Sequence, residues 1–383
     1  MLYADYNGSA PLLPSVKEYL HKRIDSDLFA NPNALHSLGQ KLKKGMEKCR
    51  GVIADSVGAY SDQIIFTSGS SEGVSTVLHS ILEYTEKKIV ITSPVEHVAV
   101  VKALSWYKEK RGIQVLMVEI DEDGVVNLDD LRTLLEKNKG NIAMVTIMAS
   151  QNETGVIEPF EKMAKICREN DVCFFSDTTQ LIGKADFHFE KSGMDYAVCS
   201  GHKIGALSGT GFIIAKDPTL IHPLIFGSTQ ENGLRGGTQH YLGIETLAIA
   251  LSDFKEKGHK LKDLNLARLN FEKEIKRAFP KAVVIGEKAE RLPGTTLIGY
   301  PGIHGQAVQI ELESNDVFVT TSAACTDNQP ETSVVLKAMG VTDDIGRGVI
   351  RISLSYSHGQ KDYDLCSTAL KNAYNKLIKI HSY

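Results

Sequence analysis

A lysine and an acid, each placed after a short apolar run, are the residues of this chain best suited to chemistry. Asp177 ends one such run, and Lys203 follows another within Ser200-Gly201-His202-Lys203. A lysine amine forms a Schiff base with an aldehyde, and an acid keeps a pyridine nitrogen protonated, so the pair can hold pyridoxal 5'-phosphate (PLP) as an electron sink. The spacing therefore predicts a PLP site, with Gln180 close behind the acid.

Two further apolar runs also end in polar residues. Ser70 and Ser71 lie in a strand-to-helix turn, where small hydroxyls and free backbone N–H groups make a phosphate cradle. His97 follows another strand, and an imidazole can stack on a pyridine ring. Each residue taken alone has an ordinary alternative, such as a helix N-cap for the serines or Asp177, a polar loop histidine, or a solvated lysine. Their order on one sheet argues against four unrelated features.

The elements that must position these residues follow from apolar periodicity. Short β-rich runs alternate with amphipathic stretches such as 128–137 and 160–169. The runs cover residues 64–67, 88–91, 115–118, 142–147, 173–175, 196–199 and 211–215. Such alternation predicts βαβ units and an α/β fold with a mostly parallel central sheet covered by helices on both faces. Ligands then bind at the carboxyl ends of the strands.

A second, smaller α+β domain is expected after about Leu242. A charged helical region extends to about Phe279 with a break near Gly258, and short strands and helices follow it. The strands are expected at 283–285, 296–299 and 349–353, and the helices at 306–312, 333–339 and 361–378. We expect a large cofactor-binding domain over residues 15–255. Residues 1–14 and 256–383 would form the small domain, which carries Cys325 and Arg351.

Composition narrows the class of protein further. The chain has 383 residues, of which 42% are apolar and 23% charged, with a net charge of -4. It has no apolar run long enough for a membrane span, and its charge argues against bulk nucleic-acid binding. The beginning of the sequence has no export pattern, and the six cysteines form no CxxC pair. We expect a cytoplasmic protein with free thiols and no metal site.

Taken together, these motifs make the chain resemble the cysteine desulfurases of the NifS/IscS type, which are fold-type I PLP enzymes of the class V aminotransferase group. The resemblance extends over nearly the whole chain. The matching stretches are Tyr3-Ala4-Asp5-Tyr6, Asn31-Pro32-Asn33, Phe66-Thr67-Ser68-Gly69, Glu96-His97-Val98-Ala99-Val100, Gln151-Asn152-Glu153-Thr154-Gly155, Asp177-Thr178-Thr179-Gln180, Ser200-Gly201-His202-Lys203, Leu234-Arg235-Gly236-Gly237-Thr238, Ser322-Ala323-Ala324-Cys325-Thr326 and Ile350-Arg351-Ile352-Ser353-Leu354.

The resemblance implies roles toward the cofactor. Lys203 would form the Schiff base with PLP and move protons. Asp177 would pair with the pyridinium, Gln180 would donate to the phenolic oxygen, and His97 would stack on the ring and take part in catalysis. The residues that would hold the phosphate are Ser70, Ser71, Ser200 and His202.

The resemblance also implies a homodimer and a substrate clamp. Thr238 would reach the phosphate bound by the neighbouring subunit. Asn152 and Arg351 would hold the carboxylate of the L-cysteine substrate, with Asn31 nearby, because a guanidinium grips a carboxylate through two parallel hydrogen bonds.

The prediction of sulfur chemistry rests on Cys325. It lies among small and polar residues from Val319 to Asn328, whereas the other five cysteines lie in predicted strands or helices. The resemblance implies that the Cys325 thiolate takes the substrate sulfur as a persulfide, leaves L-alanine, and passes the sulfur to an acceptor such as an iron–sulfur cluster scaffold or a thiolation factor. Asp327 departs from the family pattern and would disfavour a nearby thiolate.

Two alternatives remain open from the sequence. One is another PLP enzyme of the same group, such as an aminotransferase or a selenocysteine lyase-like enzyme, whose turnover would not need Cys325. The other is a catalytically silent binding or scaffold protein on the same fold, against which the joint presence of Lys203, Asp177, His97 and Arg351 argues.

Overall fold

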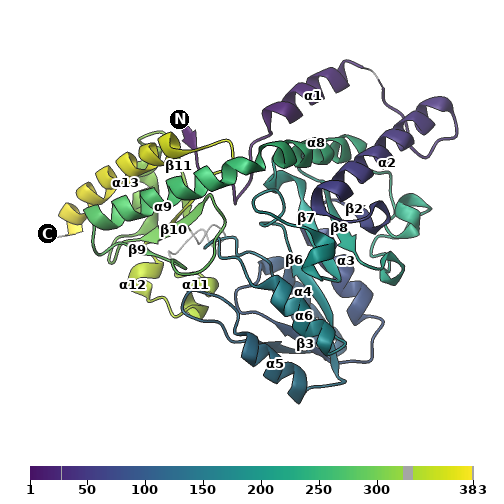
Figure 1. Ribbon diagram of the computed structural model, residues 1–383, viewed down its shortest axis with the longest axis horizontal. Helices are drawn as coiled ribbons and strands as arrows, with labels where there is room; N and C mark the ends of the chain where they lie inside the picture. Colours follow the sequence, from purple (N-terminus) through teal and green to yellow (C-terminus); the bar gives the residue numbers. More distant parts are fainter. Residues whose placement is uncertain (27, 322–330, 382–383) are drawn as a thin grey trace.

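A seven-stranded sheet forms the centre of the larger part of the molecule (Figure 1). In spatial order its strands are β2 (Ile64–Thr67), β8 (Gly211–Ala215), β7 (Tyr196–Ser200), β6 (Cys173–Asp177), β5 (Ile142–Thr146), β3 (Ile89–Thr92) and β4 (Gln114–Met117). The strands from β7 to β4 are parallel, which confirms the predicted sheet. Only β8 runs antiparallel to its neighbours, because the connection 201–210 from β7 is too short for a crossover helix.

Alternate residues of this sheet face two separate hydrophobic clusters. In β8, Phe212 and Ile214 belong to one cluster and Ile213 and Ala215 to the other. The first cluster includes residues of α2 (Ser37–Val57), α6 (Phe160–Glu169) and α8 (Tyr241–Lys257); the second includes residues of α3 (Ser70–Leu82) and α4 (Val98–Arg111). Helices therefore cover both faces, as the near-continuous apolar strands predict.

A smaller antiparallel sheet lies beside the large one. Its order is β12 (Thr320–Thr321), β13 (Ile350–Ser353), β10 (Thr295–Gly299) and β9 (Val283–Val284). The helices α9 (Leu261–Ala278) and α13 (Gln360–His381) lie side by side over it (Figure 1). The remaining helices are α1 (Pro14–Ile24), α5 (Leu128–Lys137), α7 (Phe189–Ser192), α10 (Gly305–Glu313), α11 (Val334–Ala338) and α12 (Asp343–Gly346).

The N-terminal residues join the two sheets. The strand β1 (Leu2–Tyr3) pairs with β11 (Val317–Phe318), and Asp5 forms a bridge with Ser353 of the small sheet. A few residues later, Ala10 N–H donates to the carbonyl of His202 in the turn that follows β7. The segment between Asp5 and Ala10 therefore crosses from one sheet to the other at the site of Lys203.

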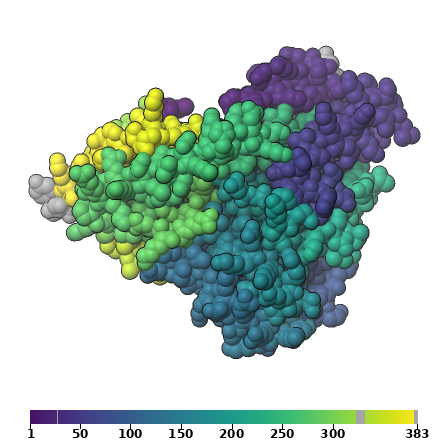
Figure 2. Space-filling model, viewed as in Figure 1, coloured from purple at the N-terminus to yellow at the C-terminus, as the bar shows by residue number. Residues whose placement is uncertain are grey.

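The structure describes residues 1–26, 28–321 and 331–381. Cys325 lies outside the described residues. Within the described ranges, none of the helices is both long and apolar enough to cross a membrane. Figure 2 shows the C-terminal residues (yellow) and those near 270–300 (green) on one side of the molecule, with residues 100–220 (blue to teal) on the other. We propose a domain boundary at about residue 255, close to the break between α8 and α9.

Candidate active site

A cavity of about 410 Å³ lies at the carboxyl ends of the parallel strands. Its volume falls within the range of small-molecule pockets, about 300 to 1,000 Å³. The walls bring together nine of the residues predicted from the sequence, namely Ser70, Ser71, His97, Asn152, Asp177, Gln180, Ser200, His202 and Lys203. Since β2, β3, β5, β6 and β7 end at the same edge of the sheet, their following loops meet here.

Lys203 ends the short 3-10 turn Gly201–Lys203 that follows β7. Its Nζ donates to the carbonyl of Asn7 at 2.8 Å and to that of Gly8 at 2.6 Å. Burial and the nearby Arg351 guanidinium lower the pKa of Lys203 to about 8, against the opposing charges of Asp5 and Asp177. About a tenth of the amine is therefore unprotonated at pH 7, far more than for an ordinary lysine, and this is the form that condenses with an aldehyde.

Asp177 is the last residue of β6 and is buried. Its Oδ1 accepts hydrogen bonds from the backbone N–H of Thr179 and from the Thr179 hydroxyl. No helix begins here, so Asp177 is not a helix N-cap; these contacts form a local turn that fixes the carboxylate at the cavity wall. Gln180 is held in turn, because its Nε2 donates to the carbonyl of Asn7 at 2.9 Å.

His97 and His202 line the same cavity from different strands. His97 is the N-cap of α4, where its Nδ1 accepts from the Ala99 N–H at 3.2 Å, so one ring nitrogen is engaged and the ring is oriented. Burial and the charges of Lys203 and Lys184 lower the pKa of His202 to about 4, which leaves its imidazole neutral.

The beginning of α3 lies where the sequence predicts a phosphate cradle. The first backbone N–H groups of a helix, here those of Ser70 and Ser71, have no partner within the helix and attract anions. Gly69 precedes them with a φ of 156°, a conformation that a side chain would strain. A Cβ atom added to Gly211 would lie 2.7 Å from the Gly69 Cα, so glycine is needed for the two backbones to approach.

Arg351 projects from β13 of the small sheet toward the same region. Its Nη1 donates to the carbonyl of Asn152 at 2.9 Å and its Nη2 to Asp5 at 2.6 Å. Its Nε is buried without a partner among the described residues. A guanidinium with a free donor beside Asn152 is suited to bind a carboxylate.

Four predicted residues do not line this cavity, and one of them is Arg351, which reaches it only through its contact with the Asn152 carbonyl. Asn31 and Thr238 are both exposed at the surface, and Cys325 lies outside the described residues. The segments that carry Asn31 and Thr238 contact each other, since Asn33 Nδ2 donates to Gln239 Oε1 at 3.3 Å.

Sequence reasoning missed two residues at the site, Asn7 and Lys184. Asn7 is 2% exposed and its backbone carbonyl accepts from both Lys203 and Gln180. Its Nδ2 donates to the Asn152 carbonyl at 3.2 Å. In the sequence, Asn7 stands in none of the motifs that mark the predicted site.

The chain as a whole matches known proteins. A family model described as aminotransferase class-V matches residues 2–365. The chain belongs to the class V aminotransferase family, in its NifS/IscS-like group. A cysteine desulfurase IscS of Dictyoglomus turgidum is 31% identical over 388 aligned positions, covering 100% of this chain and 96% of that protein. A cysteine desulfurase of Nostoc sp. is 33% identical over 356 positions, covering 92% of this chain and 88% of that protein.

Solved structures of this family share the fold. A NifS-like protein has a TM-score of 0.89 at 30% identity, covering 98% of this chain and 100% of its own. A structure described as SspA in complex with cysteine has a TM-score of 0.80 at 27% identity, covering 93% of this chain and 99% of its own. The family is PLP-dependent. The cavity fits this cofactor, since it combines a lysine amine, a buried carboxylate and a helix N-terminus.

Proposed function

We propose that this protein is a PLP-dependent cysteine desulfurase that converts L-cysteine to L-alanine and transfers the sulfur to Cys325. The observation that carries the proposal is the convergence of Lys203, Asp177 and Gln180 in one cavity. The whole-length similarity to curated cysteine desulfurases supports the same activity. The cysteine named in the SspA structure supports the substrate class.

When bound, PLP supplies an electron sink for the negative charge that develops at the substrate α-carbon. Lys203 would hold the cofactor through Nζ and would remove the α-proton of the bound substrate. Asp177 keeps the pyridine nitrogen protonated, while Asn152 and Arg351 orient the substrate carboxylate. The Cys325 thiolate attacks the substrate sulfur, so a sulfur–sulfur bond forms as the carbon–sulfur bond breaks. A proton delivered to the β-carbon and a proton returned to the α-carbon by Lys203 would then complete L-alanine.

The other five cysteines are poor candidates for the sulfur-accepting thiolate. Burial raises the pKa of Cys49 to about 11 and those of Cys167, Cys199 and Cys366 to about 12. Burial also raises the pKa of Cys173 well above its usual value. Because the thiolate is the nucleophile, these residues stay unreactive near neutral pH. This elimination supports Cys325.

The proposal extends to a homodimer in which Thr238 and Asn31 complete the partner's site. Both residues are exposed and lie on adjoining segments away from the cavity of their own chain. Large apolar side chains on the same segments are exposed as well: Leu35 is 93% and Phe226 is 82% exposed. Exposed apolar groups of this kind favour burial against another subunit. The finer proposals of a cytoplasmic location and an iron–sulfur or thiolation acceptor rest on the family resemblance.

Mass spectrometry after treatment with L-cysteine tests the function directly. The expected result is one added sulfur atom on the peptide that contains Cys325, with L-alanine in solution. A Cys325→Ala protein should bind PLP normally and lose sulfur transfer, whereas Cys49→Ala should leave both unchanged. Full desulfurase turnover by Cys325→Ala would contradict the proposal. Pyridoxamine phosphate formation from an amino donor would favour an aminotransferase instead.

A further inference from the structure

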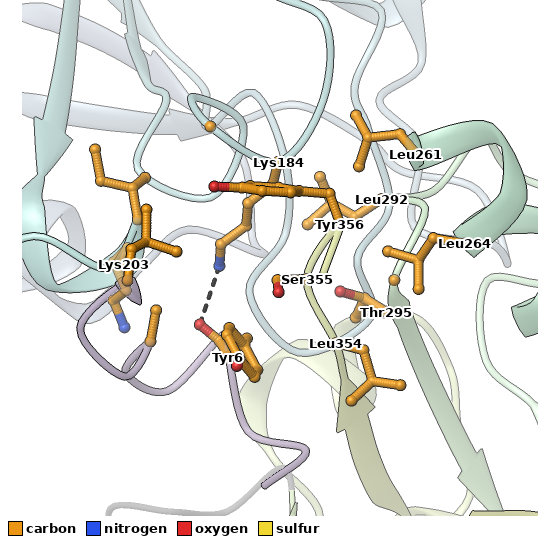
Figure 3. A pocket seen from close by; sticks show the side chains of 15 residues that line it. Tyr6, Lys184, Lys203, Leu261, Leu264, Leu292, Thr295, Leu354, Ser355 and Tyr356 are labelled. Atoms are coloured by element: carbon orange, nitrogen blue, oxygen red, sulfur yellow. Dashed lines mark hydrogen bonds between the residues drawn. The ribbon is translucent and has the colours of Figure 1, made fainter. Parts of the chain in front are cut away.

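Lys184 is a second lysine beside the site, and the proposed reaction does not use it. Its Nζ donates to Gln180 Oε1 at 2.5 Å, to Asn7 Oδ1 at 3.0 Å and to the Tyr6 carbonyl at 3.2 Å. Figure 3 shows this side chain reaching toward Tyr6, with Lys203 lining the same small cavity of about 30 Å³. Much of the remaining wall is apolar, formed by Leu13, Ile204, Leu261, Leu264, Leu292 and Leu354.

This environment is costly for a charged amine. Burial, followed by the charges of Lys203 and Arg351, lowers the pKa of Lys184 well below its usual value. The charged and titratable groups that act on it are these two cations, Asp5, which opposes them, and Cys199. Three oxygen acceptors nevertheless surround Nζ, and only the protonated amine has three hydrogens to donate. If these contacts were purely structural, an uncharged side chain could make them without the desolvation penalty of a buried charge.

The contacts of Lys184 decide which end of the Gln180 amide is available. Lys184 occupies Oε1, and one hydrogen of Nε2 goes to the Asn7 carbonyl. Gln180 also lines the main cavity, so its second amide hydrogen is the group left for a ligand there. An amide without the Lys184 contact can rotate and present its oxygen instead, because the two ends are nearly the same shape.

We infer that Lys184 is a positioning residue that fixes the Gln180 amide so that its N–H donates to the phenolic oxygen of PLP. Asn7 shares this task, since its Oδ1 accepts from Lys184 and its carbonyl from Gln180. The inference rests on the proposed PLP site and adds a residue that acts through Gln180 rather than on the substrate. A donor at the phenolic oxygen stabilises its negative charge and so favours loss of the neighbouring Schiff-base proton.

The test is a pH titration of the visible absorbance of the bound cofactor, without substrate. In Lys184→Met the titration midpoint should rise by about one pH unit, because the Gln180 amide is no longer fixed with its N–H toward the phenolic oxygen. Gln180→Ala should also raise the midpoint. The double variant should match Gln180→Ala, since Lys184 acts through that amide. Lys191→Met, an exposed lysine on α7, is the control and should leave the midpoint unchanged.

The outcomes separate this inference from the proposed function. An unaltered midpoint in a folded, cofactor-loaded Lys184→Met protein overturns the inference, as does a double variant whose shift equals the sum of the single shifts. Urea unfolding of each variant reports a purely structural effect, which would leave the midpoint in place. If Lys184→Met does not fold, Lys184→Gln replaces it under the same criteria. Absence of the absorbance band from the unaltered protein would instead overturn the proposed function, and this inference with it.

Discussion

Nη2 of Arg351 lies 2.6 Å from Oδ1 of Asp5, a pairing of residues from opposite ends of the chain. Only 7% of the Arg351 side chain is exposed, so the contact holds the guanidinium in one orientation at the edge of the small sheet. The second anchor of Arg351 is the carbonyl of Asn152, which leaves Nε as the donor without a partner among the described residues. The N-terminal segment therefore helps to build the proposed substrate clamp.

Replacement of Arg351 should weaken substrate binding more than cofactor binding. We expect Arg351→Ala to raise the KM for L-cysteine about 10- to 100-fold, because a charge-assisted hydrogen bond contributes about 1.5 to 3 kcal/mol. PLP content measured by absorbance should stay near that of the unaltered protein. Arg347→Ala is the control, since Arg347 is exposed and pairs with the exposed Asp343. A KM unchanged by Arg351→Ala would exclude the clamp.

The pKa of Lys203 should govern the uptake of PLP by the apoprotein. Burial lowers this pKa to about 8, so the reactive unprotonated amine increases as the pH rises through that value. We expect the rate of PLP uptake to increase from about pH 7 and to level off above about pH 8, well below the usual lysine pKa of about 10.4. Stopped-flow absorbance measures the rate. A rate that keeps rising to about pH 10 would show an unshifted lysine.

The buried pair of Arg50 and Glu231 should be important for stability. Glu231 is 1% exposed at the side chain, accepts from Arg50 at 2.8 Å and also accepts from the backbone N–H of Phe66. It therefore ties the segment that carries Thr238 to α2 and β2. We expect Glu231→Ala to lower the free energy of unfolding by about 1 to 3 kcal/mol, because it leaves Arg50 with only the half-exposed Glu47 as ion-pair partner and the Phe66 N–H without its acceptor. Urea unfolding measures the loss.

A double variant tests the coupling of the Arg50–Glu231 pair. Removing both partners leaves no uncompensated charge, so Arg50→Ala with Glu231→Ala should cost clearly less than the sum of the two single changes. Strict additivity of the three measured free energies would indicate that the two side chains stabilise the fold independently.

Buried carboxyl groups should make the protein less stable at alkaline pH. Burial raises the pKa of Glu96 to about 8, and its Oε2 has no partner among the described residues, which suits a protonated acid. In the unfolded chain this carboxyl loses its proton at about pH 4.5, whereas in the folded protein it keeps the proton up to about pH 8. Between these two values the folded state binds more protons than the unfolded state, so the free energy of unfolding falls as the pH rises.

Glu96→Gln should reduce this fall by up to about 1.4 kcal/mol per pH unit, because the amide mimics the neutral acid and does not titrate. Thermal or urea unfolding at several pH values measures the slope. The exposed Glu136→Gln variant should keep the slope of the unaltered protein. An identical slope in Glu96→Gln would mean that Glu96 is ionised in the folded state.

The residues that follow the sheet strands were predictable because local patterns encode them. An apolar run of residues, a turn and a helical period mark where each strand ends, and parallel strands bring those ends to one edge. Asp177, Lys203, His97 and Ser70 stand at strand ends of this kind, and they line one cavity. The helix break near Gly258 was likewise confirmed, between α8 and α9.

The antiparallel direction of β8 and the roles of Asn7, Lys184 and Asp5 required the tertiary structure. Asn7 contributes mainly through a backbone carbonyl, which every residue type possesses, so its identity carries little signal. Asp5 acts through Arg351, and Lys184 acts through Gln180. Asp5 and Arg351 lie at opposite ends of the sequence, so only the folded chain brings them together. The sequence by itself determined the chemistry at the strand ends. Only the tertiary structure decided how those groups are held. The N-terminal segment packs between the two sheets, and its contacts follow no periodic pattern of residues that the sequence could reveal.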